Sequence, residues 1–433
     1  MTDRDGDRIS LLGFSRGAYT ARTYVSFVPL VDFILKEPVA SVAALVAFFG
    51  LLPAESNEND FKVLQDAYFA PSRNHYLYQG YCALKDYLFR PEHSSDVGPF
   101  NKDARKRFRE DADTFCSRYK TRPVDIDFVG VWDTVNSVGL VTAAEAMFTS
   151  TNPKLRVLRH AIALDERRAR FDRAMWRIKP KDEAKKDSLE TKPVKPYPRK
   201  EQVWFAGAHC DVGGGAVLND TRHSLACIPL RWMIRECFKT ETGIIFDRQT
   251  LKDIGFDPTS LYPVVRPRPA PLPLHEDAVI QYAPSRWSWP FGSKEQQNSE
   301  NAPVKTEEEH DHDDALAPVY DQLEVGYYSW NLLEIVPVKK WNSVTRKQTR
   351  DFNLRSGRVI DVHINKVDDQ NNPLPEKEWK RLPPIKVHHT VKMRMHAKGG
   401  PGKGKYIPAA KLDFKGGMDL EADIDSDLVE WVY

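Results

Sequence analysis

Residues 13–17 form the pattern G-x-S-x-G, whose serine can act as a nucleophile when it lies on a sharp turn between a strand and a helix. The pattern follows a short apolar run at residues 8–12, and helical spacing begins at Ala18. Its two glycines remove the side chains that would clash in such a turn. We therefore predict that Ser15 is a nucleophile and that the backbone N–H of Arg16 helps to hold an oxyanion. The alternative is a turn in which the serine only caps the helix.

A serine hydroxyl becomes a good nucleophile only when a histidine takes its proton, and that histidine needs a carboxylate to orient it. Asp133 follows an apolar run at residues 124–132 that is typical of a strand buried in a parallel sheet. His209 follows a third run, residues 202–206, in a glycine-rich loop. Because both residues come at the end of a strand, we predict that they are the acid and the base for Ser15. The alternative for Asp133 is a cap of the turn that follows it.

Two further residues compete for these roles. Asp211 lies two positions after His209 and is the rival acid, although its position also suits a residue that shapes the loop by accepting bonds from nearby backbone N–H groups. His388 lies late in the chain and is the rival base; the other interpretation is a partly exposed histidine at the end of a strand. Spacing alone leaves both alternatives open.

Two other patterns carry residue types that bind ligands. His310 and His312 lie in the acidic run at residues 307–314, but we predict a solvated loop there because its composition would not hold metal ligands rigidly. The three glycines at 213–215 lack the spacing and the Lys-Ser/Thr of a phosphate-binding loop. We therefore predict no metal and no cofactor.

The elements around these residues alternate between apolar strand-like runs and helical segments, with glycine loops after the strands. This order predicts an α/β fold with a mostly parallel sheet, helices on both faces and long loop insertions. We expect a catalytic core at residues 1–240 with a solvated insertion at about 177–200. The remaining residues, 241–433, should extend the same domain and contain a loop rich in proline and acidic residues at about 263–314.

Further elements follow from local patterns. A helix is expected after the glycine loop, with an N-cap at Asn219 or Asp220 and with apolar residues on one face. Strand-like pieces occur at residues 359–362 and 386–388. These pieces predict that the sheet continues late in the chain.

Composition excludes several classes of protein. The 433 residues carry a net charge of +2, so no overall field favours nucleic acid or an acidic membrane. Five cysteines without a C-x-x-C pair argue against a disulfide framework and a zinc ribbon. The N-terminus has no signal-peptide core, and the longest apolar run, residues 39–52, is shorter than the ~20 residues of a spanning helix. We predict a cytoplasmic protein without a transmembrane segment, with residues 39–52 as a buried helix.

Four segments in order resemble an uncharacterised α/β-hydrolase family that is frequent in fungi and shares its catalytic domain with the phospholipase effectors of bacterial type VI secretion. They are GFSRGAYTAR (13–22), VGVWDTVN (129–136), RHAIALDERRAR (159–170) and WFAGAHCDVGGG (204–215), and residues 315–330 and 387–395 also resemble the fungal branch. The resemblance implies an α/β-hydrolase fold and a triad of Ser15, Asp133 and His209. It also implies a lipid ester, such as a phospholipid, as substrate, with transient contact to a membrane surface.

The sequence departs from the family pattern before its first motif. Family members begin with a strand, an F-D-G-T-x-N-like loop and further strands, whereas here the serine motif starts at residue 13. The resemblance therefore implies an N-terminally truncated chain that lacks the first strands and a second oxyanion donor, a loss that typically costs ~100- to 1,000-fold in rate. Residues 23–49 also form a longer insert than is usual. The alternative function is thus an inactive hydrolase-fold protein with a binding role or none.

Overall fold

The computed structural model describes part of the chain, in two compact units. The described residues are 8–15, 18, 126–135, 155–169, 171, 173, 175, 199–218, 221–273, 277–281, 305–325, 334, 337–342, 347–364, 374–375, 378–399, 404–413, 418–419 and 427–433. The first unit comprises Met1–Leu158 and Arg173–Arg177, and the second comprises Arg159–Asp172 and Ile178–Tyr433. The predicted division of the chain at residue 240 stays a prediction.

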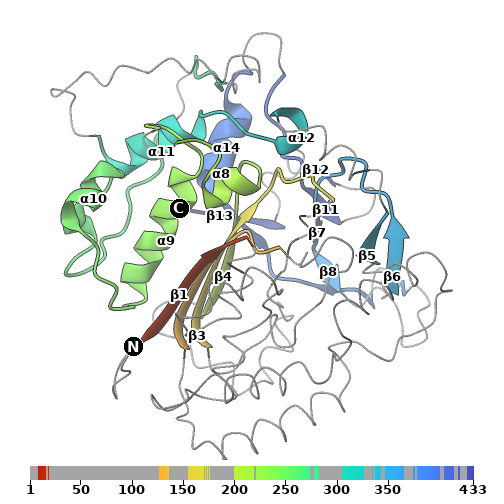
Figure 1. Ribbon diagram of the computed structural model, residues 1–433, viewed down its shortest axis with the longest axis horizontal. Coiled ribbons are helices and arrows are strands. Elements are labelled where there is room, and N and C mark those ends of the chain that lie inside the picture. Colours follow the sequence, from red (N-terminus) through yellow and green to blue (C-terminus); the bar gives the residue numbers. More distant parts are fainter. Residues whose placement is uncertain are drawn as a thin grey trace, which may run out of the picture. The chain divides into compact units, whose positions relative to one another are not determined.

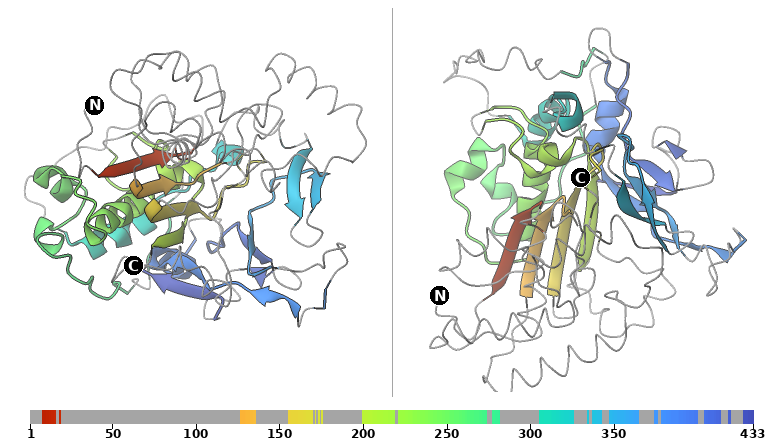
Figure 2. Two further views of the ribbon diagram at one scale, coloured as in Figure 1. Left: turned by 90° about the horizontal axis from the view of Figure 1, so that it is seen from below. Right: turned by 45° about the vertical axis from the view of Figure 1, so that its right-hand side comes forward.

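This α/β fold contains a six-stranded parallel sheet (Figures 1 and 2). Its strands, in the order in which they pair, are β1 (Ile9–Phe14), β2 (Ile126–Trp132), β3 (Leu155–Ala163), β4 (Lys200–Phe205), β10 (Ile385–His388) and β13 (Val429–Val432). The strands expected from the three apolar runs and from residues 386–388 are confirmed, and so is the parallel sheet.

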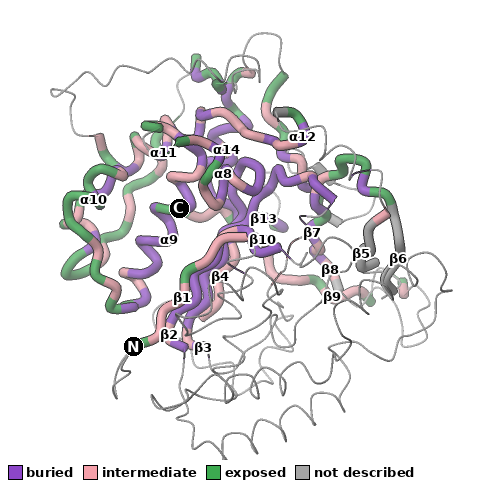
Figure 3. The backbone as a smooth tube through the Cα atoms, in the orientation of Figure 1, coloured by how far each residue is buried: buried purple, intermediate pink, exposed green. Residues whose placement is uncertain are grey.

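The central strands are apolar and almost wholly buried, which is typical of strands in a parallel sheet. All of β3 except Arg156 is buried, and β2 is buried except at Asp127 and Trp132 (Figure 3). In the first unit, side chains of β2 and β3 pack with the buried Ala18, and the half-buried Leu11 of β1 completes this cluster. Each fully buried apolar side chain of this kind stabilises the fold by about 1.5–3 kcal/mol.

β3 is the strand that the sequence analysis missed, because charged residues interrupt its apolar pattern. Arg159 lies in the middle of the strand and is completely buried. Its guanidinium forms an ion pair with Glu236, 77 positions further along the chain. A buried charge is tolerated only with such a partner. The alternation of apolar and polar residues along the sequence does not reveal that partner.

The helices with described bounds all lie in the second unit. They are α8 (His209–Gly213), α9 (Cys227–Lys239), α10 (Arg248–Asp253), α11 (Glu307–Ala315), α12 (Gln322–Val325) and α14 (His389–His396), with a 3-10 turn, η2, at Pro258–Ser260. None of the helices in the described ranges combines the length and the apolar character that a membrane span requires. The predicted coverage of both sheet faces stays a prediction.

α9 is the helix expected after the glycine loop, but its predicted start is wrong. The helix begins at Cys227 after an N-cap at Ala226, which makes no side-chain cap bond. The predicted caps, Asn219 and Asp220, lie outside the described residues. The apolar face is confirmed, since Ile228 and Trp232 are buried.

α11 corrects the prediction of a loop through residues 263–314, which is wrong over its last eight positions. Thr306 caps the helix: its hydroxyl accepts the N–H of Glu309 at 3.3 Å, and the Glu309 carboxylate accepts the N–H of Thr306 at 2.7 Å. Acidic residues in a first turn also suit the positive end of the helix dipole. The acidic run is therefore a capped helix.

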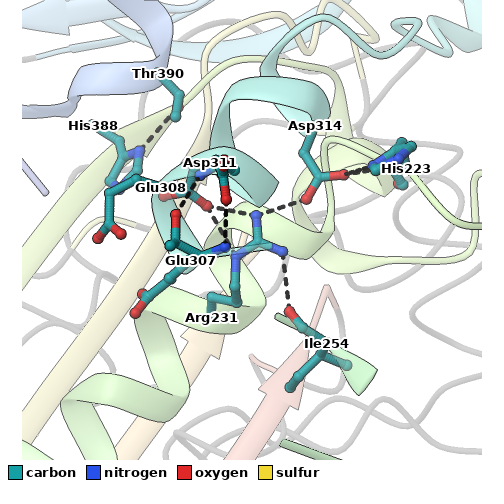
Figure 4. A network of polar contacts seen from close by, with 12 residues as sticks. His223, Arg231, Ile254, Glu307, Glu308, Asp311, Asp314, His388 and Thr390 are labelled. Carbon is teal, nitrogen blue, oxygen red and sulfur yellow. Dashed lines mark hydrogen bonds and ion pairs between the residues drawn. The ribbon is translucent and has the colours of Figure 1, made fainter. Parts of the chain in front are cut away.

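Three carboxylates of α11, those of Glu307, Asp311 and Asp314, are buried against arginines instead of being solvated (Figure 4). Arg231 donates from Nε to Asp311 at 2.9 Å and from Nη2 to Asp314 at 2.6 Å. Arg235 pairs with Glu307 in the same cluster. The expectation of a solvated acidic run is wrong at these three residues because α9, whose arginines lie 72 to 83 positions earlier in the chain, supplies the cations.

Three small sheets complete the second unit. They are the pair β5 (Val338–Asn342) and β6 (Lys347–Asp351), the pair β8 (His363–Ile364) and β9 (Lys380–Arg381), and a sheet of β7 (Val359–Asp361), β11 (Lys411–Asp413) and β12 (Met418–Asp419). β7 confirms the strand expected at residues 359–362. The buried helix predicted at 39–52 and nearly all of the insertion predicted at 177–200 lie outside the described residues.

Candidate active site

Ser15 directly follows β1 and has a strained backbone. Its φ is +60°, in the left-handed region that residues other than glycine rarely adopt. Its N–H donates to the carbonyl of Trp132 on the neighbouring strand at 3.0 Å, which ties the turn to the sheet. A serine in a strained turn after a strand is the geometry by which a nucleophile projects its Oγ. Arg16, the predicted oxyanion donor, lies outside the described residues.

Asp133 occupies the corresponding position on the next strand. β1 and β2 pair in parallel with Phe14 opposite Trp132, so Ser15 and Asp133 are each the next residue after a paired position. Both residues therefore lie at the carboxyl ends of these two strands, on the same side of the pair. Asp133 is completely buried and has φ +38°, so two of the five non-glycine residues with positive φ in the described chain occur at these adjacent strand ends. Strained residues of this kind concentrate at functional sites.

His209 follows β4 and is the first residue of α8, after an N-cap at Ala208. The residue is only 3% exposed. The imidazole meets the ring of Phe171 edge to face, with centroids 4.8 Å apart and planes at 74°. Its backbone N–H donates to Oε2 of Glu166 at 3.2 Å. Both partners lie shortly after β3, so the end of that strand contacts His209 through main chain and side chain.

Gly207 explains why the loop before His209 needs glycine. Its φ is +105°, and a Cβ added there would lie 2.4 Å from the Cβ of Asp211. No side chain fits so close an approach. The glycine therefore allows the turn from β4 to fold back on α8, which places His209 next to the strand end.

Asp211 is buried beneath the same loop. Its Oδ2 accepts the N–H groups of Ala208 at 2.9 Å and Tyr320 at 3.0 Å, which are the bonds expected of a residue that shapes the loop. Burial raises the pKa of this carboxyl to about 7, and the negative charge of Asp165 contributes in the same direction. Its role as the rival catalytic acid stays a prediction.

His388 is not the partly exposed histidine that was one interpretation of the sequence. It ends β10, is 1% exposed, and stacks on the ring of Phe205 with centroids 5.0 Å apart. Its Nδ1 lies 2.9 Å from the Thr390 hydroxyl, beside the acidic residues of α11 (Figure 4). Burial, followed by the neighbouring His389, lowers the pKa of His388 well below its usual value. His388 is therefore a neutral histidine in a packed environment.

The two histidines of the acidic run, His310 and His312, lie on α11. His310 packs against Gly255, where an added Cβ would lie 2.5 Å from its ring. His223 lies 3.3 Å from Asp314, and its ring centroid is 6.5 Å from that of His310. In the part of the chain that the structure describes, no group of histidine, cysteine and acidic side chains is arranged to hold a metal ion.

A parallel α/β sheet with a strained serine and an aspartate at adjacent strand ends is consistent with an α/β-hydrolase-like domain. More specifically, the chain belongs to the family described as type VI secretion phospholipase effector, Tle1-like, catalytic domain. The family model matches residues 2–236, more than half of the chain. The fungal branch and the truncation inferred from the resemblance stay predictions.

One solved structure with similarity to the chain is described as an uncharacterized protein from Pseudomonas aeruginosa. The two share 15% sequence identity with a TM-score of 0.24, and the match covers 57% of this chain. It spans only 39% of that protein. No curated protein matches the sequence.

Proposed function

We propose that this protein is a serine hydrolase that cleaves carboxylic esters of lipids, with phospholipids as the substrate class. Ser15 is the nucleophile, His209 the base and Asp133 the carboxylate that orients the imidazole. The observation that carries the proposal is the strained φ of Ser15 at the end of β1, beside Asp133 at the end of β2. Membership of a phospholipase family supports the substrate class.

The proposed reaction has two halves. In the first, the Oγ of Ser15 attacks the ester carbonyl carbon while His209 takes the hydroxyl proton. The backbone N–H of Arg16 stabilises the negative oxygen of the tetrahedral intermediate, which collapses as the leaving alcohol receives the proton from His209. In the second half, water attacks the acyl-serine by the same route, which releases the carboxylic acid and restores Ser15.

His209 is preferred over His388 as the base for two reasons, the packing of His388 and the position of His209 within the matched family region. His388 lies against Phe205 and its Nδ1 is next to Thr390, at the end of β10. His209 belongs to the matched family region, residues 2–236, whereas His388 lies beyond it. Asp133 is preferred over Asp211 because it directly follows the strand that pairs with β1, beside Ser15, whereas the carboxylate of Asp211 binds the backbone N–H groups of Ala208 and Tyr320.

A fluorophosphonate probe tests the nucleophile and the base in one series. The wild-type protein should be labelled, and Ser15→Ala should abolish labelling. His209→Gln should reduce the labelling rate by at least about 1,000-fold, as expected for loss of a triad member, whereas His388→Gln should retain it. Thermal unfolding of every variant shows whether it is folded.

A second assay tests the substrate class. Vesicles of phosphatidylcholine should yield free fatty acid with the wild-type protein and none with Ser15→Ala. Folded wild-type protein that is neither labelled nor active would refute the proposal in favour of a binding protein. Loss of labelling in His388→Gln but not in His209→Gln would move the base to β10.

A further inference from the structure

Three consecutive backbone N–H groups before and at His209 each donate to a different buried carboxylate. The N–H of Gly207 donates to Asp165 at 2.6 Å, that of Ala208 to Asp211 at 2.9 Å, and that of His209 to Glu166 at 3.2 Å. All three carboxylates are at most 6% exposed. Each of the three backbone N–H groups has its own acceptor, so this loop is held at every residue.

Asp165 and Glu166 come shortly after β3, in the segment D-E-R-R at residues 165–168. Asp165 also accepts the Tyr406 hydroxyl at 2.7 Å and the N–H of Ala409 at 2.9 Å. The backbone pairing of β3 with β4 continues past the strands, since the N–H of Asp165 donates to the carbonyl of Gly207 at 3.0 Å. The contacts of Asp165 therefore anchor the loop to the sheet.

Glu166 belongs to a closed circle of contacts around His209. Arg168 holds the Glu166 carboxylate with two bonds, from Nε at 2.9 Å and from Nη2 at 2.8 Å. The Arg168 guanidinium lies 3.5 Å over the ring of Phe171, and the same ring meets the imidazole of His209. His209 is thus held by its backbone through Glu166 and by its ring through Phe171.

Electrostatics keep this circle intact. Burial alone would raise the pKa of the Glu166 carboxyl, but the bonds and charge of Arg168, with a contribution from Arg358, hold it below its usual value. Arg358 also donates to the carbonyls of Ala163 and Phe171 at 2.9 and 2.8 Å, which fixes the segment at both ends. Glu166 is therefore ionised and able to accept from the N–H of His209 over the neutral pH range.

We propose that Glu166, Arg168 and Phe171 are positioning residues, which fix the backbone and the ring plane of His209 for proton transfer. The inference rests on the proposed role of His209 as the base. A base must lie within hydrogen-bond reach of the proton that it removes. A misplacement of about 1 Å can cost about 100-fold in rate, so a loss of ring support should slow the reaction without unfolding the protein.

The test compares aromatic and aliphatic residues at position 171. Phe171→Leu removes the ring that contacts both His209 and Arg168, whereas Phe171→Tyr keeps it. We expect labelling of Ser15 by a fluorophosphonate to slow by about 10- to 100-fold in the leucine variant. The tyrosine variant should recover most of the wild-type rate.

A matched pair of arginine variants tests the other side of the circle. Arg168→Lys keeps the charge but loses the planar fork that binds Glu166 and stacks on Phe171. Arg167→Lys makes the same change one residue earlier, where the guanidinium pairs instead with Asp321 and Glu324. Labelling should slow in the first variant and stay at the wild-type rate in the second.

A spectroscopic measurement separates this inference from the proposed function. In an NMR spectrum of protein with 13C-labelled histidine, the ring signal of His209 is the one that disappears in His209→Gln. It should move in Phe171→Leu and Arg168→Lys, and stay in place in Arg167→Lys. An unchanged signal in Phe171→Leu refutes positioning, whether or not the wild-type protein is labelled. If the fluorophosphonate does not label the wild-type protein but the His209 signal still moves in Phe171→Leu, the positioning role is retained and the catalytic role is rejected.

Discussion

Replacing Asp211 by asparagine should remove a strong pH dependence from the stability of the protein. Asp211 is 1% exposed, and its Oδ2 accepts the N–H groups of Ala208 at 2.9 Å and of Tyr320 at 3.0 Å, while its Oδ1 makes only a longer contact of 3.3 Å to the same Tyr320 N–H. The amide oxygen of an asparagine in the same rotamer can accept both bonds. Asp211→Asn therefore removes the ionisation while it preserves the hydrogen bonds that shape the loop.

The magnitude follows from the raised pKa of Asp211. Burial, together with the charge of Asp165, raises the pKa from an ordinary value of 3.8 to about 7. Between these two values the folded protein retains a proton that the unfolded chain has released, so the free energy of unfolding falls as the pH rises. The slope is about 1.4 kcal/mol per pH unit, which amounts to about 4 kcal/mol lost between pH 4 and pH 7. Above pH 7 the contribution stays constant.

Urea unfolding of the wild type and of Asp211→Asn between pH 4 and pH 8 measures this effect. All other titratable groups are common to both proteins, so the difference between their free energies of unfolding isolates the contribution of Asp211. The asparagine variant should gain about 4 kcal/mol relative to the wild type between pH 4 and pH 7, and nothing further above it. Two curves that stay parallel over that range would show that the carboxyl titrates normally and that the burial argument is wrong.

Two further predictions concern stability. Gly207→Ala should lower the free energy of unfolding by about 3 kcal/mol, because it combines a positive φ with an overlap against Asp211; Gly243→Ala, which has a positive φ and open space around it, should lose only about 1 kcal/mol. Equal losses in chemical denaturation would contradict the overlap. Arg231→Met removes the cation that Asp311 and Asp314 share, although Asp311 keeps its ion pair with Arg268, and should cost about 3–5 kcal/mol. Arg381→Met breaks an exposed ion pair and should leave the melting temperature nearly unchanged, so similar melting shifts would argue against the buried network.

The sequence by itself determined the features that depend on local patterns. The G-x-S-x-G motif after a short apolar run indicated a serine on a strained turn, and Ser15 has that backbone conformation. The apolar runs at residues 124–132 and 202–206 indicated two further strands, which are β2 and β4. Strand alternation and turn chemistry act over a few residues, so one sequence is enough to reveal them.

Only the tertiary structure decided which charged residues are buried. Arg159 made β3 look too polar for a central strand, and α11 has the composition of a solvated loop. Both are packed into the fold because partners far along the chain neutralise them: Glu236 for the strand, and arginines such as Arg231 for the helix.

The same reason explains why the residues around His209 were not recognised as a group. Glu166, Arg168 and Phe171 lie about 40 positions before His209 in the sequence, and nothing in their spacing indicates a contact with it. Removing a charge from water is unfavourable unless an opposite charge and hydrogen bonds compensate for it. That compensation depends on distances in three dimensions, which the fold determines when β3 and β4 come to lie side by side.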